Sequence, residues 1–276
     1  MTMDRSDGDT VDGGGAGRDP WLHLAAMTPA RIAIGRAGGS LPTREVLAFA
    51  LAHAKARDAV HAALDTAGIA AALAAIDLAT VTVESEARDR AAYLRRPDWG
   101  RRLSAAATES LARHRHGPVD LVIVIADGLS ATAVEAGAVR LVADSAPRLG
   151  AAGIGLGPVV IATGARVALG DAVAAALDAR AVLVLIGERP GLSAADSLGA
   201  YLTFDARPGR ADADRNCVSN IRDGGLGIDA AAFKLAWLTR EAFRRRLTGV
   251  ALKDDSDPAL SVAAGADRLA GGPSQG

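Results

Sequence analysis

Three short loops of the chain carry the residue types that could contact a ligand. They span residues 127–130 (Asp-Gly-Leu-Ser), 163–167 (Thr-Gly-Ala-Arg-Val) and 187–191 (Gly-Glu-Arg-Pro-Gly), and each follows an apolar run. Glycine lets a ligand approach the backbone, and the carboxylates of Asp127 and Glu188 could accept hydrogen bonds. The three loops therefore predict a ligand-binding face. The alternative is that these glycines only turn the chain.

Sequence motifs of several common enzyme classes are absent. No lysine follows a glycine, which excludes a phosphate-binding P-loop, and the sequence has neither Gly-x-Ser-x-Gly nor His-Glu-x-x-His. Residues 153–158 resemble a dinucleotide fingerprint, but they precede an apolar run, and Pro158 stands where the third glycine belongs. We interpret this segment as a turn. Residue spacing alone therefore assigns no reaction.

The composition excludes further classes of function. The 276 residues include 31 Lys and Arg against 32 Asp and Glu, and aromatic residues make up 3%. A net charge of −1 provides no basic field for nucleic acid or acidic lipid. Cys217 is the only cysteine, so neither an intrachain disulfide nor a thiolate zinc cluster is expected. With a polar start at residues 1–12 and no transmembrane run, the sequence predicts a cytoplasmic protein.

The elements that must position these loops can be read from the hydrophobic pattern. Three apolar runs, Val119–Ala126, Val159–Ala162 and Ala181–Ile186, are typical of strands buried on both faces. Helical patterns at 131–149 and 169–179 lie between them, which predicts a βαβαβ unit with a parallel sheet. Ligands bind beyond the carboxyl ends of such strands, where the three loops lie. We also expect a helix over 228–247, with further strands at Tyr201–Phe204 and Gly249–Lys253 as candidates.

The remaining sequence predicts a four-part organisation. Helices are expected over 44–67 and 100–115, with a strand or an extended connector at Thr80–Val83. We predict an α/β protein in which a small, mostly helical N-terminal domain precedes a Rossmann-like domain. The expected divisions are a disordered tail at 1–19, the helical domain at 20–115, the Rossmann-like domain at 116–255 and a flexible tail at 256–276.

Six sequence blocks together resemble the small (light) subunit of ethanolamine ammonia-lyase, an adenosylcobalamin-dependent enzyme. They occur in order from about residue 30 to 255. The blocks are GRAGG at 35–39, the helix after Thr43, YLRRPDWGRRL at 93–103, IADGLSATA at 125–133, LIGERPGLSAADSL at 185–198 and DRNCVSNIR at 214–222. GRAGG and YLRRPDWGRR are typical of an intersubunit or domain-packing surface, with a solvated face as the alternative.

The resemblance implies a two-subunit radical enzyme that converts ethanolamine to acetaldehyde and ammonia. A large TIM-barrel subunit would carry the substrate-handling residues, and six large plus six small subunits would assemble. Adenosylcobalamin would lie at the interface of the two subunits. The sequence has no Asp-x-His-x-x-Gly motif, so we expect base-on cobalamin. The short, acidic N-terminal segment favours free cytoplasm over a bacterial microcompartment.

The resemblance also implies which residues touch the cofactor. Val167 in GARVAL, Glu188 in GERPG and Cys217 in DRNCVSN carry over by motif position. Glu188 would accept hydrogen bonds from corrin amides, Val167 would make apolar contact, and Cys217 would act through packing or its backbone. Neighbouring residues are added as further contacts: Asp127, Ser130, Arg189 and Asn216. An Asx turn or helix cap is the alternative role of Asp127. No catalytic or metal-binding residue is expected in this chain.

Two other functions are compatible with the residues. The chain could be a stand-alone Rossmann enzyme that binds a nucleotide or another cofactor, although the phosphate fingerprints are missing. It could also be an assembly or reactivation factor for a cobalamin enzyme, without a place in the catalytic complex.

Overall fold

The structure is a computed structural model that describes residues 21–28 and 30–257. Its contacts divide the chain into two units, with the division between His53 and Ala54. The predicted tail at 1–19 lies outside the described residues, and so does most of the predicted tail at 256–276. Ser256, which is described, is fully buried, and its hydroxyl accepts a hydrogen bond from Lys234 Nζ at 3.1 Å.

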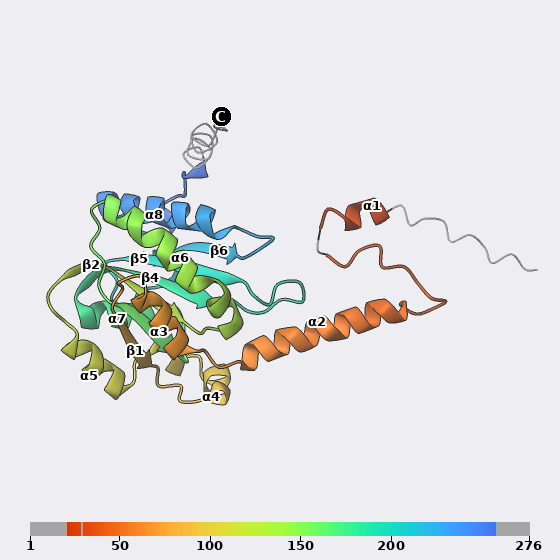
Figure 1. The fold of residues 1–276 in the computed structure, drawn as a ribbon, viewed down its shortest axis with the longest axis horizontal. Coiled ribbons are helices and arrows are strands. Elements are labelled where there is room, and N and C mark those ends of the chain that lie inside the picture. Colours follow the sequence, from red (N-terminus) through yellow and green to blue (C-terminus); the bar gives the residue numbers. More distant parts are fainter. Residues whose placement is uncertain (1–20, 29, 258–276) are drawn as a thin grey trace, which may run out of the picture. The chain divides into compact units, whose positions relative to one another are not determined.

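The second unit contains a six-stranded mixed sheet (Figure 1). The strands lie in the order β1-β3-β2-β4-β5-β6. Their bounds are β1 Thr80–Glu84, β2 Val119–Ala126, β3 Val159–Thr163, β4 Ala179–Gly187, β5 Leu198–Phe204 and β6 Asn216–Ile221. The first four strands of that order are parallel, whereas β5 and β6 are antiparallel to their neighbours. The predicted parallel βαβαβ unit is confirmed as β2 to β4.

The fold prediction of a parallel sheet is corrected by the structure, in which the sheet is mixed. Only residues 188–197 join β4 to β5, which is too short for the crossover that a parallel pairing requires. The chain therefore turns back on itself. Leu198 pairs with Gly187 and Phe204 with Ala181, and β6 then adds to the outer side of β5.

Helices cover both faces of the sheet. One hydrophobic core joins α3, α6 and α8 to one face, and a second joins α5 and α7 to the other (Figure 1). Leu121, Ile123 and Ile125 of β2 point into the first core, and Val122 and Val124 into the second. The helix bounds are α1 Leu22–Ala25, α2 Thr43–His61, α3 Thr66–Ala74, α4 Arg90–Arg95, α5 Ala105–Arg113, α6 Ala131–Ala151, α7 Leu169–Leu177 and α8 Ile228–Arg245.

Several element boundaries differ from the prediction. The helix expected over 44–67 ends at His61, and α3 follows it as a separate helix. The side chain of Asp65 caps α3 by accepting a hydrogen bond from Gly68 N at 2.9 Å. The segment at 80–83 is strand β1, which pairs with β3, so the sheet includes a strand from before residue 115.

The strand considered at Gly249–Lys253 is wrong. This segment forms a short 3₁₀ helix, η3, at Gly249–Ala251. Gly249 has φ +79°, and a Cβ there would lie 2.0 Å from the carbonyl oxygen of Ala213. A positive φ is incompatible with a regular strand, and the close approach leaves no room for a side chain at this position. Two other 3₁₀ turns, η1 at Trp99–Arg101 and η2 at Asp212–Asp214, precede α5 and β6.

Candidate functional site

The three predicted loops lie together at the carboxyl edge of the parallel strands. Asp127 Oδ2 accepts a hydrogen bond from Gly164 N at 2.8 Å, which joins the loops after β2 and β3. Leu129 N donates to Gly187 O at 2.9 Å, which joins the loops after β2 and β4. The expectation that these loops share one sheet edge is confirmed.

Asp127 lines the crevice between the ends of β2 and β3, together with Thr163 and Gly164. The chain leaves these strands towards opposite faces of the sheet, which makes this the switch point where such folds bind ligands. The Asp127 carboxylate also accepts hydrogen bonds from Gly128 N and Ala165 N, each at 2.9 Å. Burial raises the pKa of Asp127, and the backbone hydrogen bonds and Arg90 oppose that rise. The backbone N–H groups of Gly128, Gly164 and Ala165 thus already donate hydrogen bonds within the chain.

Ser130 and Asn216 also hold the scaffold. Ser130 is fully buried; its hydroxyl caps α6 by accepting from Ala133 N at 3.1 Å and donates to Ala195 O at 2.8 Å. The Asn216 amide donates to Leu252 O at 2.7 Å and accepts from Gly249 N at 2.8 Å, so it fixes η3 to the start of β6. Their side-chain hydrogen bonds are directed into the chain.

A cavity of about 430 Å³ lies beside the loops after β2, β3 and β4. It contains three of the predicted contact residues, Val167, Glu188 and Arg189. Tyr201 of β5 forms another part of its wall and pairs across the strands with Cys217 of β6. Two of the three residues that the resemblance identified, Val167 and Glu188, therefore line one cavity, and Cys217 lies outside this lining as the cross-strand neighbour of Tyr201. The full lining is Tyr93, Gly128, Leu129, Arg166, Val167, Ile186, Gly187, Glu188, Arg189 and Tyr201.

Glu188 is a half-buried acceptor whose orientation is fixed. Its Oε2 accepts a hydrogen bond from the Ser197 hydroxyl at 2.5 Å and a long one from Asn220 N at 3.4 Å. Glu188 N donates to Ser197 O at 2.9 Å, so backbone and side chain are held by the same neighbour. Because a carboxylate has about four lone-pair positions, Glu188 retains capacity for donors from a ligand.

Cys217 and Tyr201 lie on a face of the sheet that the helices leave partly open. Leu198, Ala200 and Leu202 of β5 pack into the core with α6 and α8, whereas Tyr201 on the opposite face is half-buried and Cys217 is exposed. Partial burial of the thiol raises the pKa of Cys217, Glu188 adds to the rise, and the Tyr201 hydroxyl opposes it. The thiol is therefore protonated at neutral pH, in keeping with a packing role rather than a nucleophilic one.

Tyr93 and Arg166 complete the wall, and reasoning about sites from the sequence missed both. The guanidinium carbon atoms of Arg166 and Arg90 lie 4.1 Å and 4.7 Å from the centre of the Tyr93 ring. The Tyr93 hydroxyl donates to Ala165 O at 3.3 Å, and burial raises the pKa of Tyr93 to about 12. Arg166 N donates to Gly100 O at 2.7 Å.

The signal for this wall was Gly100 in the block YLRRPDWGRRL. A Cβ at Gly100 would lie 2.9 Å from Arg166 Cγ and 2.9 Å from Gly164 O. Only glycine admits the Arg166 stem there without displacement. Tyr93 and Gly100 thus pack against the loop after β3, which is the domain-packing role considered for this block.

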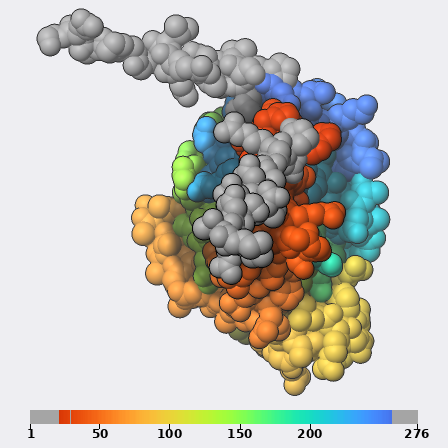
Figure 2. Space-filling view, turned by 90° about the vertical axis from the view of Figure 1, so that its right-hand side faces the viewer, coloured from red at the N-terminus to blue at the C-terminus, as the bar shows by residue number. Residues whose placement is uncertain are grey.

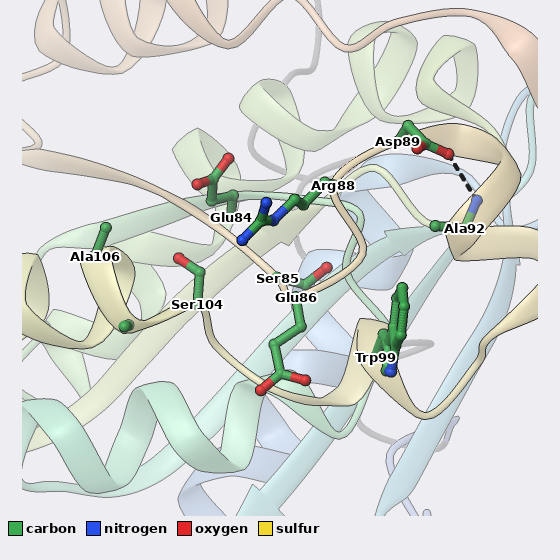
Figure 3. A pocket seen from close by; sticks show the side chains of 10 residues that line it. Glu84, Ser85, Glu86, Arg88, Asp89, Ala92, Trp99, Ser104 and Ala106 are labelled. Atoms are coloured by element: carbon green, nitrogen blue, oxygen red, sulfur yellow. Dashed lines mark hydrogen bonds between the residues drawn. The ribbon is translucent and has the colours of Figure 1, made fainter.

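A larger cavity lies elsewhere, along the segment from the end of β1 to the start of α5. It measures about 730 Å³, and its lining includes acidic and hydroxyl side chains, Arg88 and Trp99 (Figure 3). Asp89 caps α4 by accepting from Ala92 N at 2.7 Å, Glu86 pairs with Arg102 at 2.6 Å, and Ser85 donates to Gly164 O at 2.7 Å. Figure 2 shows the surface of this segment in yellow. None of the predicted contact residues lines this cavity, and several of its polar groups are engaged within the chain.

Within residues 21–28 and 30–257, no cluster of three or more His, Cys, Asp or Glu side chains could hold a metal ion. Over the same residues, no helix combines the length and apolar character that a bilayer crossing requires.

Comparison with known proteins gives one consistent match. Residues 18–253 match the family model described as "Ethanolamine ammonia-lyase light chain (EutC)". An ethanolamine ammonia-lyase small subunit from Bradyrhizobium diazoefficiens is 59% identical over 87% of this chain and 92% of its own length. Its counterparts from Rhodopseudomonas palustris and Xanthomonas campestris are 55% and 53% identical, over 86% and 88% of this chain and 92% and 90% of their own lengths. The chain therefore belongs to the ethanolamine ammonia-lyase light chain family.

Proposed function

We propose that the chain acts as the small subunit of an adenosylcobalamin-dependent ethanolamine ammonia-lyase. The enzyme would convert ethanolamine to acetaldehyde and ammonia by radical migration of the amino group. One observation carries the residue assignment: Val167 and Glu188 line the same cavity as Tyr201, the cross-strand partner of Cys217. Val167, Glu188 and Tyr201 are far apart in the sequence, and their meeting at one cavity supports the assignment.

The residues at this wall suit a corrin ring. Bound adenosylcobalamin supplies an organic radical by homolysis of its cobalt–carbon bond. The rim of the ring carries primary amides, and the Glu188 carboxylate can accept charge-assisted hydrogen bonds from their N–H groups. Val167 in the cavity lining offers apolar contact, and the protonated thiol of Cys217 adds a small, neutral surface beside Tyr201. The chain would bind and orient the cofactor, while substrate chemistry would belong to its partner.

The cofactor site would be completed by the large TIM-barrel subunit. The cavity in this chain is a wall rather than an enclosure, because Cys217 and Arg189 beside it are exposed. Exposed apolar side chains on α2, including Leu47 and Leu51 at 63% and 58% exposure, are typical of a surface that a partner covers. The family resemblance supports an assembly of six large and six small subunits.

Finer features of the assignment follow the same resemblance. The sheet, in which four parallel strands carry helices on both faces, supports the description Rossmann-like. Without the histidine motif that replaces the lower base in other corrinoid proteins, the cofactor would bind base-on. A cytoplasmic location is part of the proposal, with a bacterial microcompartment as the alternative.

A stand-alone nucleotide-binding enzyme is the weaker candidate. The Asp127 carboxylate accepts the hydrogen bonds of backbone N–H groups in the switch-point crevice, so these groups are not free to bind phosphates. An assembly or reactivation factor shares the fold but would leave the catalytic complex active without this chain.

Reconstitution tests the proposal. The chain is expressed with the large subunit encoded beside it, adenosylcobalamin and ethanolamine are added, and acetaldehyde is assayed, with each subunit alone as the control. Acetaldehyde only in the presence of both chains is the expected result. Activity of the large subunit alone would favour the assembly-factor alternative. Failure of the two chains to associate would favour the stand-alone Rossmann enzyme.

A further inference from the structure

Arg166 is a half-buried cation of the cavity wall for which the structure provides no anion, whereas Arg189, the other arginine of the lining, is exposed. The backbone of Arg166 lies in the loop after β3, directly before Val167, and its side chain lines the cavity. The guanidinium lies over the Tyr93 ring, and Nη2 donates one hydrogen bond, to Tyr93 O at 3.2 Å. Nε is buried and has no hydrogen-bond partner. Arg166 is thus held firmly in place, but its charge is not neutralised.

No carboxylate in the described part of the chain pairs with Arg166. Glu188, the carboxylate among the lining residues, is directed to Ser197 and Asn220 and makes no ion pair with Arg166. The carboxylate oxygens of Asp127, in the neighbouring loop, accept hydrogen bonds from backbone N–H groups. Asp127 Oδ2 lies 4.0 Å from Arg90 Nη1. The buried Arg215 shows the contrast, because two of its nitrogens bind Asp171 at 2.7 Å each.

A half-buried guanidinium without an anion is typical of a site that receives the anion with its ligand. Removing a charge from water is unfavourable unless a partner compensates for it. The planar guanidinium is well suited to two oxygens of one phosphate group. Cobalamin carries one such group, the phosphodiester that joins a corrin side chain to the lower base.

We propose that Arg166 binds the phosphodiester of the cobalamin nucleotide tail. This inference rests on the proposed function, because it takes the cavity wall to be the cofactor site. Glu188 would then recognise amide donors, whereas Arg166 would recognise the anionic tail beside them. The two residues, 22 positions apart, would together fix which way round the corrin ring lies against this subunit.

The test compares three corrinoids on the assembled complex of small and large subunits. Cobalamin carries phosphate and base, cobinamide phosphate carries phosphate without base, and cobinamide carries neither. Binding is measured by visible absorbance titration, which does not depend on turnover. Arg166→Met retains the aliphatic stem that packs against Gly100 and Tyr93, and Arg166→Lys retains the charge. Arg95→Met, at an exposed arginine on α4 outside the cavity, is the matched control.

Arg166→Met is expected to weaken cobalamin and cobinamide phosphate binding by about tenfold or more, with cobinamide binding unchanged. Arg166→Lys should recover part of the loss, and Arg95→Met should alter none of the three affinities. An equal loss with all three corrinoids, or no loss with cobalamin, would overturn the assignment of Arg166 alone. Failure of the unsubstituted complex to bind any of them would overturn the proposed function as well.

Discussion

Arg215 and Asp171 form a buried, two-pronged ion pair that ties the start of β6 to the first turn of α7. Both Arg215 Nη atoms lie 2.7 Å from an Asp171 oxygen, and both side chains are 2% exposed. Arg215 Nη1 also donates to Thr203 Oγ1 at 2.9 Å. The pair lies two residues before Cys217 and four residues after Val167. It therefore sets the spacing between the two sides of the proposed cofactor wall.

Replacing Arg215 with Met is expected to lower the free energy of unfolding by about 3–5 kcal/mol, because Asp171 would keep a buried, unpaired charge. Urea unfolding of the purified chain measures this change. The matched control is Arg180→Met, which breaks an ion pair with Asp120 whose side chains are 50% and 31% exposed. That loss should stay below about 1 kcal/mol. Equal losses for the two variants would contradict the importance of the buried pair.

Gly187→Ala should disrupt the junction of the loops after β2 and β4. A Cβ at Gly187 would lie 2.0 Å from Ser130 O and 2.8 Å from Asp127 O, so backbone atoms would have to move. We expect a loss of about 2–3 kcal/mol in the free energy of unfolding. Gly191→Ala in the same loop is the control, because its Cβ would meet Ala194 O at 3.6 Å, an ordinary contact. If Gly187→Ala were as stable as Gly191→Ala, the described junction would be incorrect.

Glu188→Ala should weaken cobalamin binding by the assembled complex about tenfold, since it removes a charged acceptor from the proposed cofactor wall. Its effect on the thermal stability of the chain should be small, because the side chain is half-buried and adds little to the core. Absorbance titration with cobalamin gives the affinity, and thermal melting checks the fold. Asp196→Ala removes an exposed carboxylate from the same loop and should bind cobalamin normally. Normal binding by Glu188→Ala would remove this residue from the site.

Cys217 should react slowly with iodoacetamide. Only the thiolate is alkylated, and partial burial holds the pKa of this thiol above its ordinary value, so less thiolate exists at any given pH. The alkylation rate of the isolated chain should keep rising at a pH where a cysteine peptide has levelled off. Mass spectrometry gives a clean measure because the sequence has one cysteine. Tyr201→Phe removes the hydroxyl that lowers this pKa, so it should slow the reaction further. A profile that coincides with the peptide's would contradict the described environment.

The central strands could be predicted because they are buried on both faces. Val119–Ala126 and Ala181–Ile186 are nearly continuous apolar runs, and the structure has β2 and β4 there. Strand β6 was missed because only Val218 and Ile221 of its six residues are buried. An edge strand with one open face contains too few apolar residues for their alternation along the strand to be recognised.

The site was only partly accessible to sequence reasoning. Glu188 and Val167 stand out because their motifs are local, and the structure places both at the cavity. Arg166 and Tyr93 form their wall through a contact between residues 73 positions apart. Gly100 is a local sign of close packing, but the sequence does not reveal that its partner is Arg166. Asp127 is a polar residue next to glycine in the sequence, yet its hydrogen bonds show it to be part of the scaffold.

The hydrogen bond from Leu129 N to Gly187 O bears on how fast the cofactor could associate. It holds the loops after β2 and β4 together, and Gly128 and Gly187 lie so close that a Cβ on Gly128 would be 2.3 Å from Gly187 O. A wall joined in this way has its final shape before any ligand arrives, so binding requires little ordering of this subunit. The slow step of cofactor capture should therefore lie in the approach and closure of the large subunit. Stopped-flow association rates should then respond to changes at the subunit interface far more than to changes in these loops.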